Sequence, residues 1–364
     1  MYKSFTARNF RCFKETRFAS LDRINLITGK NNVGKTSLLE AIFIHAGAYN
    51  PNLVITVNAL RGFDKIKLEF GPLAQFPWDS LFRKYDRDIK IELIGENGKS
   101  FHRTVSLKAI YKLEELRKIS KFIKIVQSEL NGLSLESSEV TLEGAKILEL
   151  ESKEDKKVNK YYLILHKKGI QTEPIPPSPP FPGFYQSDRP AFSKEMAERF
   201  GNLEKFGKQD IVLKALQVIE PNLKRLAMLV VADQPVLHGD IGIGRLVPIQ
   251  LMGGGIIRLA NLNMLIGNAE NGVVLIDEIE NGIHHSIMGK VWESLAEAAR
   301  QFNTQIFATT HSWECIVSAH KSFSNNKYYD FRLHRLEKIN EDIKAITYDR
   351  ESLDAAVSSG IEVR

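Results

Sequence analysis

The pattern of apolar and polar positions divides the chain into three stretches with different predicted elements. In the first stretch, residues 2–10 and 16–20 alternate with a period of two, which is typical of antiparallel strands. The apolar run Ile24–Thr28 is typical of a buried strand, and residues 37–43 place apolar side chains on one side of a helix. We therefore expect a small antiparallel edge joined to a strand–turn–helix unit.

The middle stretch, residues 85–172, is richer in lysine and glutamate than its surroundings. Asn97-Gly98 separates two alternating segments and predicts a hairpin. A helical period that ends at Gly132 follows, and two further strand patterns come after it. These elements are expected at residues 89–94, 100–106, 113–130, 139–150 and 160–166. We interpret the stretch as an inserted α+β lobe, followed by the proline-rich residues 174–182, which form a stiff connector.

The last stretch has the pattern of a sheet covered by helices. Helices are expected at residues 190–206, 209–219 and 286–300, and strands at residues 223–231, 236–249, 273–276 and 305–309. Apolar strands that alternate with helices predict an α/β fold with a mostly parallel sheet. We therefore divide the chain into an N-terminal lobe (1–84), the inserted lobe with its connector (85–183) and a C-terminal lobe (184–364).

Composition narrows the classes of protein that fit. With 43% hydrophobic residues in a chain of 364, a full core is expected, and the formal charge of +6 leaves contact with nucleic acid open. Cys12 and Cys315 have no CxxC spacing, which argues against a zinc site or a disulfide framework. No charged-then-apolar leader opens the chain, and no apolar run reaches the roughly 18 residues of a membrane span. We expect a cytoplasmic protein without a membrane segment.

Residues 29–36, GKNNVGKT, match the phosphate-loop pattern GxxxxGK[ST] and lie between the expected strand and helix. Glycine dihedrals let successive N–H groups of such a loop point at phosphate oxygens, and the helix adds the positive end of its dipole. Lys35 is expected to neutralise the β- and γ-phosphates, and the Thr36 hydroxyl to ligate Mg²⁺. The residues expected to bind ATP here are Gly29, Asn31, Asn32, Gly34, Lys35, Thr36 and Ser37.

Two acids follow a later apolar strand and predict hydrolysis in addition to binding. At the end of a parallel strand, Asp277 is expected to lie beside the phosphate loop and hold Mg²⁺ through water. Glu278 is expected to orient or deprotonate the attacking water. His311, at the end of the next strand, is expected to reach the γ-phosphate. We therefore predict catalytic roles for Lys35, Glu278 and His311.

A second glycine-rich helix start, residues 251–258 (LMGGGIIR), precedes the acids. The backbone of Gly253 and Gly254 can bind phosphate there, but it does not easily reach a nucleotide held by Lys35 of the same chain. We expect these glycines to cap the nucleotide of another copy. Close helix packing is the alternative use for them.

Together, the segments GKNNVGKTSLLEAI, LMGGGIIR, VVLIDEIENG and ATTHS resemble the ABC-type ATPases, within the branch of the RecF, SMC and OLD proteins. Residues 9–14 (NFRCFK) are similar to the NFRxF start of that branch, and the resemblance places Arg11 at the nucleotide. The fold it implies is a P-loop NTPase head that dimerises around two ATP molecules. The roles it implies are the Walker A loop for residues 29–36, the Walker B aspartate for Asp277, the catalytic glutamate for Glu278, the D-loop for residues 280–282 and the switch histidine for His311.

The chain departs from that family at its signature. Met252 stands where the family's LSGG signature has a serine that meets the γ-phosphate of the other copy. Gln186 is only a candidate for the Q-loop glutamine. OLD nucleases carry a TOPRIM domain after the ATPase, whereas this chain stops at Arg364. The resemblance therefore implies that a nuclease or toxin, TOPRIM-like in two-gene anti-phage systems, is a separate partner protein.

Our main hypothesis is an ATP-hydrolysing, homo-oligomeric regulator of a partner effector in DNA repair or phage defence. The first alternative is the motor subunit of a membrane transporter, in which the two glycine-rich motifs lie closer than the 217 residues between Thr36 and Gly253 here. The second is a GTPase or small-molecule kinase, although residues 326–330 miss the guanine motif NKxD by one residue. A purely architectural protein is hard to reconcile with Lys35, Asp277 and Glu278.

Overall fold

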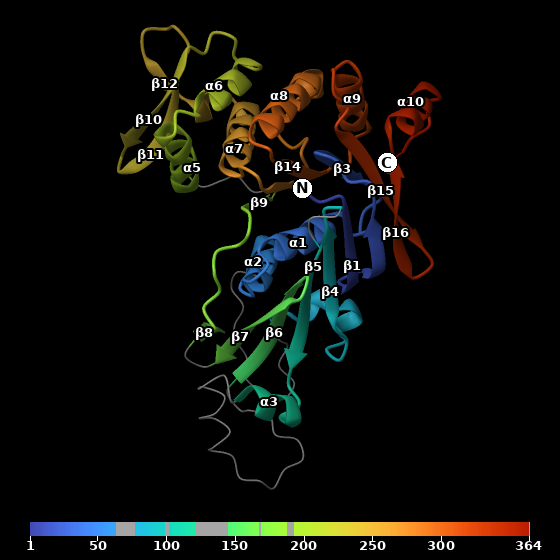
Figure 1. Cartoon of the computed structure of the whole chain (residues 1–364). Coiled ribbons are helices and arrows are strands. Elements are labelled where there is room, and N and C mark those ends of the chain that lie inside the picture. Colours follow the sequence, from blue (N-terminus) through green and yellow to red (C-terminus); the bar gives the residue numbers. More distant parts are fainter. Residues whose placement is uncertain (63–76, 99–101, 121–144, 167–168, 188–192, 364) are drawn as a thin grey trace.

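The computed structural model describes residues 1–62, 77–98, 102–120, 145–166, 169–187 and 193–363 (Figure 1). Its central six-stranded sheet has the order β16-β15-β3-β14-β13-β9, and every neighbouring pair except β15–β16 runs parallel. The strands are β3 (Ile24–Thr28), β9 (Gly183–Gln186), β13 (Val273–Ile276), β14 (Gln305–Thr309), β15 (Phe331–Ile339) and β16 (Asp342–Tyr348). The predicted α/β class with a mostly parallel sheet is confirmed.

Helices cover both faces of this sheet, because successive residues of a strand face opposite sides. Ile24 and Leu26 of β3 belong to one hydrophobic core, and Ile27 belongs to a second core on the other face. Figure 1 shows α7, α8 and α9 above the sheet and α1 below it. The helices are α1 (Lys35–Ala46), α2 (Leu53–Leu60), α3 (Leu113–Ser120), α5 (Ser193–Lys205), α6 (Asp210–Gln217), α7 (Gly254–Asn268), α8 (Met288–Gln301), α9 (Trp313–Ser324) and α10 (Arg350–Ser358).

A seven-stranded antiparallel sheet of order β2-β1-β4-β5-β6-β7-β8 lies below α1. It contains the predicted hairpin, as β4 and β5, and a second hairpin, β6 and β7. Because β1 pairs with β4, the predicted domain boundary between residues 84 and 85 falls inside one sheet. Of the helix predicted at 113–130, α3 covers residues 113–120, and the remainder lies outside the described residues. The strands are β1 (Ser4–Phe10), β2 (Phe13–Phe18), β4 (Ile91–Glu96), β5 (His102–Ile110), β6 (Ala145–Glu154), β7 (Lys157–His166) and β8 (Gly169–Glu173).

Residues 174–182 lead from β8 to β9 with no strand or helix of their own, so this proline-rich segment joins the two large sheets. Beyond β9, α5 and α6 pack against α7. A small antiparallel sheet follows, with β10 (Arg225–Val231), β11 (Gln234–Asp240) and β12 (Leu246–Pro248). The helices predicted at 190–206 and 209–219 and the strand predicted at 223–231 are therefore confirmed over the described residues, whereas the stretch predicted as strand at 236–249 forms two strands, β11 and β12, separated by residues 241–245.

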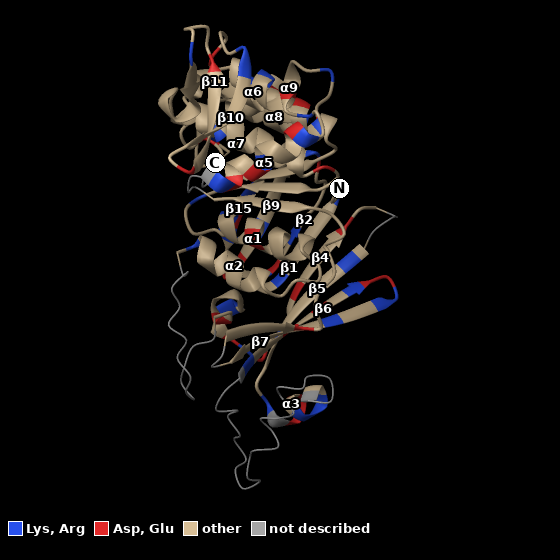
Figure 2. Ribbon diagram, turned by 90° about the vertical axis from the view of Figure 1, so that its left-hand side faces the viewer, with Lys and Arg blue, Asp and Glu red and all other residues tan. Residues whose placement is uncertain are grey.

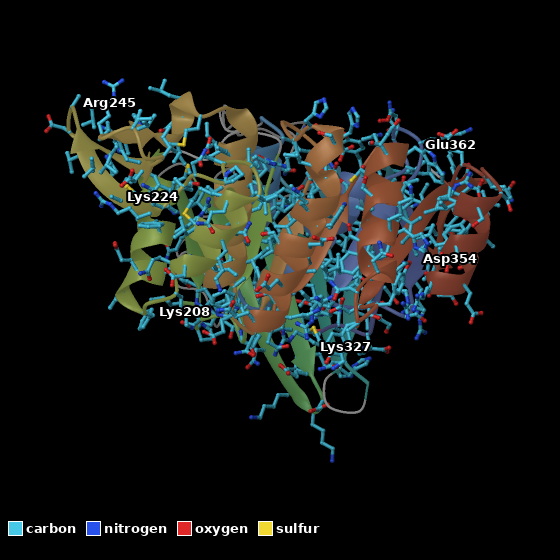
Figure 3. All side chains as sticks on the ribbon, turned by 90° about the horizontal axis from the view of Figure 1, so that it is seen from above. Lys208, Lys224, Arg245, Lys327, Asp354 and Glu362 are labelled. Carbon is cyan, nitrogen blue, oxygen red and sulfur yellow. The ribbon has the colours of Figure 1, made fainter. Side chains whose placement is uncertain are left out.

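Positions of Lys and Arg and of Asp and Glu are interspersed along the ribbon (Figure 2). In the seven-stranded sheet, Lys90 pairs with Glu151 and Lys160 with Glu149, each at 3.1 Å. Figure 3 shows Lys208, Lys224 and Arg245 at one end of the molecule and Asp354 and Glu362 at the other. None of the helices in the described residues is both long and apolar enough to cross a lipid bilayer. Contact with nucleic acid stays a prediction.

Two histidines lie where the sheets and helices meet, and neither exposes any surface. Nε2–H of His45, on α1, donates to the carbonyl of Arg103 (3.1 Å), and the Tyr2 hydroxyl donates to Nδ1 (2.7 Å). His334, on β15, contacts the Thr347 hydroxyl at 3.0 Å. Burial disfavours the imidazolium form and lowers the pKa of both rings from 6.5 to about 3. Both histidines are therefore neutral in the folded protein.

These two histidines predict a loss of stability as the pH falls. In the unfolded chain each ring binds a proton near pH 6.5, whereas the folded chain does not until about pH 3, so their contribution is present above pH 6.5 and lost below it. Between pH 7.5 and 5.5 the free energy of unfolding should fall by up to about 1.4 kcal/mol for each histidine. Urea unfolding of the wild type and of His334→Gln over this range measures the effect.

The His334→Gln protein should lose the pH-dependent contribution of His334 to the free energy of unfolding and keep the contribution of His45. Above pH 7.5 the two stability curves should run parallel, offset only by the changed packing, which is the internal control. Identical slopes for both proteins between pH 7.5 and 5.5 would contradict the assignment of a buried neutral His334.

Candidate active site

The phosphate loop has the backbone that its sequence predicts. It connects β3 to α1, and Gly29 (φ +135°), Asn32 (φ +62°) and Gly34 (φ +93°) lie in the region that favours residues without a Cβ. A Cβ at Gly34 would collide with the sulfur of Cys12 and the ring of Phe13. Gly34 caps α1 without a side-chain hydrogen bond, so the first N–H groups of the helix have no side-chain acceptor there. Such a set of donors suits an anionic oxygen.

Lys35 is held inside the loop. Its ammonium donates to the carbonyl oxygens of Gly29 (2.7 Å) and Lys30 (3.0 Å), and the residue is only 7% exposed. Burial lowers the pKa of this ammonium, while the charges of Asp277 and its acidic neighbours act in the opposite direction. The side chain is therefore positioned between the loop and the acids, as its predicted role requires.

A cavity of about 670 Å³ opens on the loop. Arg11 and His311 line it together with the predicted loop residues Asn31, Asn32, Gly34, Lys35, Thr36 and Ser37. Arg11 forms an ion pair with the buried Glu40 of α1 at 2.6 Å, and its guanidinium donates to the Asn58 side chain at 3.0 Å. Arg11 is therefore a fixed part of the cavity wall. Its contact with nucleotide, and those of the loop residues, stay predictions.

The two acids leave the end of β13 in a geometry that Thr309 and Arg258 hold. The Thr309 hydroxyl donates to Oδ1 of Asp277 (2.5 Å) and accepts from the N–H of Glu278 (2.8 Å). Arg258, in the first turns of α7, donates to the carbonyls of Asp277 (2.9 Å) and Glu278 (3.2 Å). Glu278 has φ +48°, which side-chain-bearing residues adopt rarely and which needs such support.

The Glu278 carboxylate faces two polar neighbours. Asn281 donates from Nδ2 to one oxygen at 2.7 Å, and Nε2 of His311 lies 3.8 Å from the other. The backbone N–H of His311 donates to Glu280 at 2.8 Å, which ties the end of β14 to the loop after β13. The structure thus brings Glu278 and His311 together as predicted, and their side chains remain 40% and 41% exposed. Their catalytic roles stay predictions.

Gly253 and Gly254 lie elsewhere. Neither lines the cavity among the described residues, both are exposed, and a Cβ on either would meet open space. Gly253 caps α7 with φ +111° and no side-chain hydrogen bond, as Gly34 caps α1. Met252 is half-buried. The two glycine-capped helix starts are therefore on different parts of one chain, which is consistent with the expectation that the second one serves another copy.

Gln186 is turned away from the cavity. Its side chain is buried, accepts from Asn261 of α7 and donates to the carbonyl of Ser187 (2.8 Å). Its main-chain oxygen accepts from the N–H of Asp277 at 2.8 Å. The position at the end of β9 fits the Q-loop, but the side chain does not line the cavity in this conformation.

Several residues of the site have roles that no motif predicts. Arg61, just after α2, lines the cavity, pairs with Glu40 at 2.5 Å and donates to the Ser37 hydroxyl at 3.2 Å. The signal for Glu40 is its place in the apolar run of residues 38–44, where an acid needs a buried partner. Arg61 lies in none of the quoted segments, and although Arg258 and Thr309 stand in LMGGGIIR and ATTHS, their contacts come from the packing of distant segments.

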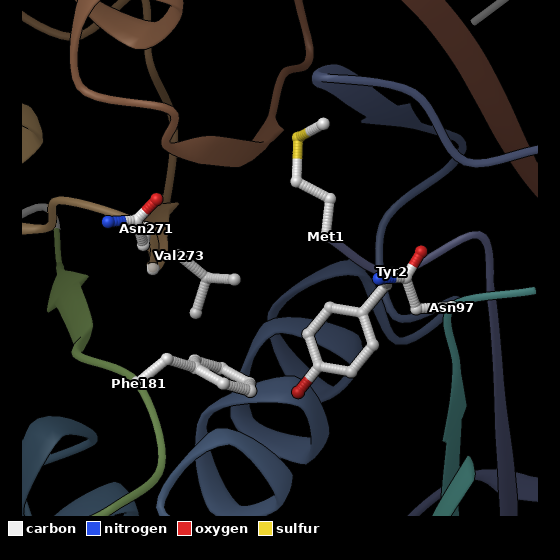
Figure 4. A pocket seen from close by; sticks show the side chains of 7 residues that line it. Met1, Tyr2, Asn97, Phe181, Asn271 and Val273 are labelled. Carbon is white, nitrogen blue, oxygen red and sulfur yellow. The ribbon is translucent and has the colours of Figure 1, made fainter. Parts of the chain in front are cut away.

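A second cavity, of about 190 Å³, lies at the opposite edge of the sheet, where β13 begins. Figure 4 shows Met1, Tyr2, Phe181 and Val273 around it. Ligands of open parallel sheets bind at the carboxyl ends of the strands. This cavity is therefore not the nucleotide site.

Comparisons with known proteins agree with this geometry. The family described as "AAA domain, putative AbiEii toxin, Type IV TA system" matches residues 24–316. A protein of Helicobacter pylori named "ATP/GTP phosphatase" is 22% identical over 344 residues, which cover 87% of this chain and 86% of that protein. The "DNA replication and repair protein RecF" of Desulforamulus reducens is 54% identical over 41 residues, 11% of each chain.

A solved structure is similar over nearly the whole chain. The "Crystal structure of the SmcHead bound to the C-winged helix domain of ScpA" has a TM-score of 0.50 and 12% identity, and the match covers 97% of this chain and 99% of that one. At this identity the likeness shows the fold alone. It confirms the predicted fold of a P-loop head, and the ATPase activity follows from the family match and the Helicobacter pylori relative.

Gly34→Ala should weaken triphosphate binding while leaving the fold intact. A Cβ there is strained by the backbone and collides with Cys12, so the loop must shift away from its phosphate-binding geometry. A penalty of about 1–2 kcal/mol corresponds to a roughly 5- to 30-fold rise in the Kd of Mg-ATP, measured by calorimetry. Gly169→Ala is the matched control, since its φ of +132° is equally unfavourable but no atom lies within 4 Å of the new Cβ. Wild-type affinity in Gly34→Ala would contradict the assignment of the loop.

Proposed function

The chain belongs to the AAA-domain family that matches residues 24–316, and on this basis we propose that two copies close around ATP and that their closure controls a separate effector. The chain is a P-loop ATPase. The observation that carries the proposal of closure is the exposed start of α7, where Gly253 and Gly254 present uncapped N–H groups away from their own cavity. A helix start of this kind binds phosphate well, and a second copy can supply the phosphate.

We assign the contacts of the substrate to the chain's own residues. The first N–H groups of α1 hold the β- and γ-phosphates, and Lys35 exchanges its bonds to the carbonyls of Gly29 and Lys30 for phosphate oxygens. The Thr36 hydroxyl and the Asp277 carboxylate are the side chains that would hold Mg²⁺, which when bound neutralises charge on the β- and γ-phosphate oxygens. Thr309 orients Asp277 for this task.

Glu278 is the group we assign to the attacking water. Its carboxylate is fixed by Asn281 and partly exposed, so one oxygen can accept a proton from a water placed opposite the γ-phosphate. His311 lines the same cavity, with its Nε2 3.8 Å from Glu278, and we assign its side chain to the γ-phosphate. When the cleaved phosphate dissociates, it takes away the charge that joins the two copies, and the dimer opens.

We further propose that the partner is a nuclease or toxin, with a TOPRIM-like enzyme as the leading candidate, in phage defence or DNA repair. The family description names a toxin of a type IV system, and the RecF relative is named for DNA replication and repair. We keep the OLD proteins as the proposed branch, because they combine an ATPase with a TOPRIM nuclease. In this scheme the predicted lobes 1–84 and 184–364, together with β4 that pairs with β1, form the ATPase, and the strands β5–β8 contact the effector.

Glu278→Gln should bind ATP and fail to hydrolyse it. The amide keeps the shape of the side chain but cannot take the proton of water, so kcat should fall by about 10²- to 10⁴-fold with the Kd of ATP unchanged. Phosphate release and calorimetry measure the two quantities. Glu270→Gln is the matched control, because this exposed glutamate pairs with Lys208 far from the cavity. Wild-type turnover in Glu278→Gln would sink the assignment of the base.

Gly254→Glu should prevent the closure of two copies. A glutamate at a helix start is favourable for folding, but here it would repel the phosphates of the second copy. In the Glu278→Gln background, Mg-ATP should double the molar mass seen by light scattering, and Gly254→Glu should abolish the doubling while ATP still binds. Gly201→Glu, on an exposed face of α5 with equal space, should dimerise normally. A monomer in the ATP-saturated Glu278→Gln protein would overturn the proposal.

A further inference from the structure

The nucleotide cavity has an aromatic wall that the phosphate-binding residues leave unexplained. Phe82, Lys84 and Tyr85 line it, on a segment that comes about fifty residues after the phosphate loop. Phe82 is buried in the core, whereas Tyr85 is 63% exposed. We call residues 77–88 the rim segment.

The rim segment is fixed to the body of the protein. Trp78 and Leu81 are fully buried, and a β-bridge joins Phe82 to Phe10. The N–H of Arg11 donates to the carbonyl of Leu81 at 2.7 Å, so the rim is attached to the residue that forms the neighbouring cavity wall. Tyr85 is therefore exposed on a rigid support and not at the end of a loose loop.

The backbone that presents the ring is strained. Lys84 and Tyr85 both have left-handed φ angles, +56° and +60°, which are uncommon for residues with a Cβ and rarer still in succession. Glu341, at the tip of the β15–β16 hairpin, supports the turn by pairing with Lys84 at 3.0 Å, and its carbonyl accepts from Arg83 at 3.2 Å. Strain of this kind persists where the surroundings impose it, and it concentrates at ligand sites.

The phosphate loop forms only part of the cavity wall. The phosphates of a bound nucleotide occupy the start of α1, at Lys35 and Thr36, so the ribose and base must extend along the remaining wall. The rest of the lining contains two aromatic rings, the buried Phe82 and the exposed Tyr85. An exposed ring at this place offers the flat apolar face that every nucleobase can stack on.

We propose that Tyr85 is the stacking platform for the nucleobase, and this inference rests on the proposed binding of ATP in the same cavity. Stacking recognises the face of a base and not its hydrogen-bonding edge. Tyr85 therefore supplies affinity for nucleoside triphosphates without choosing between adenine and guanine. The phenol hydroxyl is not needed for this role, whereas the ring is.

The test separates the base from the phosphates. The Kd values of Mg-ATP, Mg-GTP and inorganic tripolyphosphate are measured by calorimetry for the wild type, Tyr85→Ala and Tyr85→Phe. Tyr85→Ala should weaken ATP and GTP by about 5- to 30-fold, the lower part of the range for base–aromatic stacking, because the ring is partly exposed. Tyr85→Phe should match the wild type, and tripolyphosphate should bind all three proteins equally.

Each other result overturns the inference in a distinct way. Unchanged ATP affinity in Tyr85→Ala would show that the base does not contact the ring. An equal loss for ATP and tripolyphosphate would show that the residue acts only on the shape of the cavity, and a loss in Tyr85→Phe would show that the hydroxyl is what binds. A wild type that binds neither ATP nor tripolyphosphate would overturn the proposed function as well.

Discussion

The site depends on one electrostatic constraint at the carboxyl edge of the six-stranded sheet. There, the positive start of α1 and the buried Lys35 ammonium face the carboxylates of Asp277 and Glu278. Both sets of charges are placed by the parallel order β3-β14-β13, which puts the ends of β3 and β13 on the same edge with only β14 between them. The donors and Lys35 suit the anionic phosphates and the carboxylates suit a cation, so the edge fits a triphosphate with Mg²⁺ on chemical grounds.

The backbone around this edge is held by contacts between segments that are far apart in the chain. Glu278 keeps its left-handed conformation because Thr309, from β14, accepts its N–H and Arg258, from α7, binds its carbonyl. Arg258 also donates to the carbonyl of Ser187, just after β9. One arginine of the second glycine-capped helix thus contacts both the loop after β13 and the end of β9. A movement of α7 would therefore shift the backbone of the two acids directly.

Much of the fold could be predicted from the sequence, because its strongest signals are local. The buried strand Ile24–Thr28, the glycines at 29 and 34 and the acids after β13 each follow from residue type and spacing, and the structure places them together. The union of the middle strands with β1 could not be foreseen, because pairing of β1 with β4 across more than eighty residues leaves no local pattern. The same holds for Arg61, Arg258 and Tyr85. These side chains belong to the cavity or its support only because folding brings three distant segments to one edge.

Amide hydrogen exchange with and without Mg-ATP, followed by mass spectrometry, tests most directly whether the two glycine-capped helix starts share one triphosphate. If they do, ATP should slow exchange in peptides that cover residues 29–38, and in the Glu278→Gln protein it should also slow exchange at residues 253–258. The slowing at the second segment should depend on protein concentration, since it needs another copy. The proposal that the two helix starts share one triphosphate would be contradicted by protection at residues 253–258 that does not change with protein concentration. It would also be contradicted by the absence of protection at both segments.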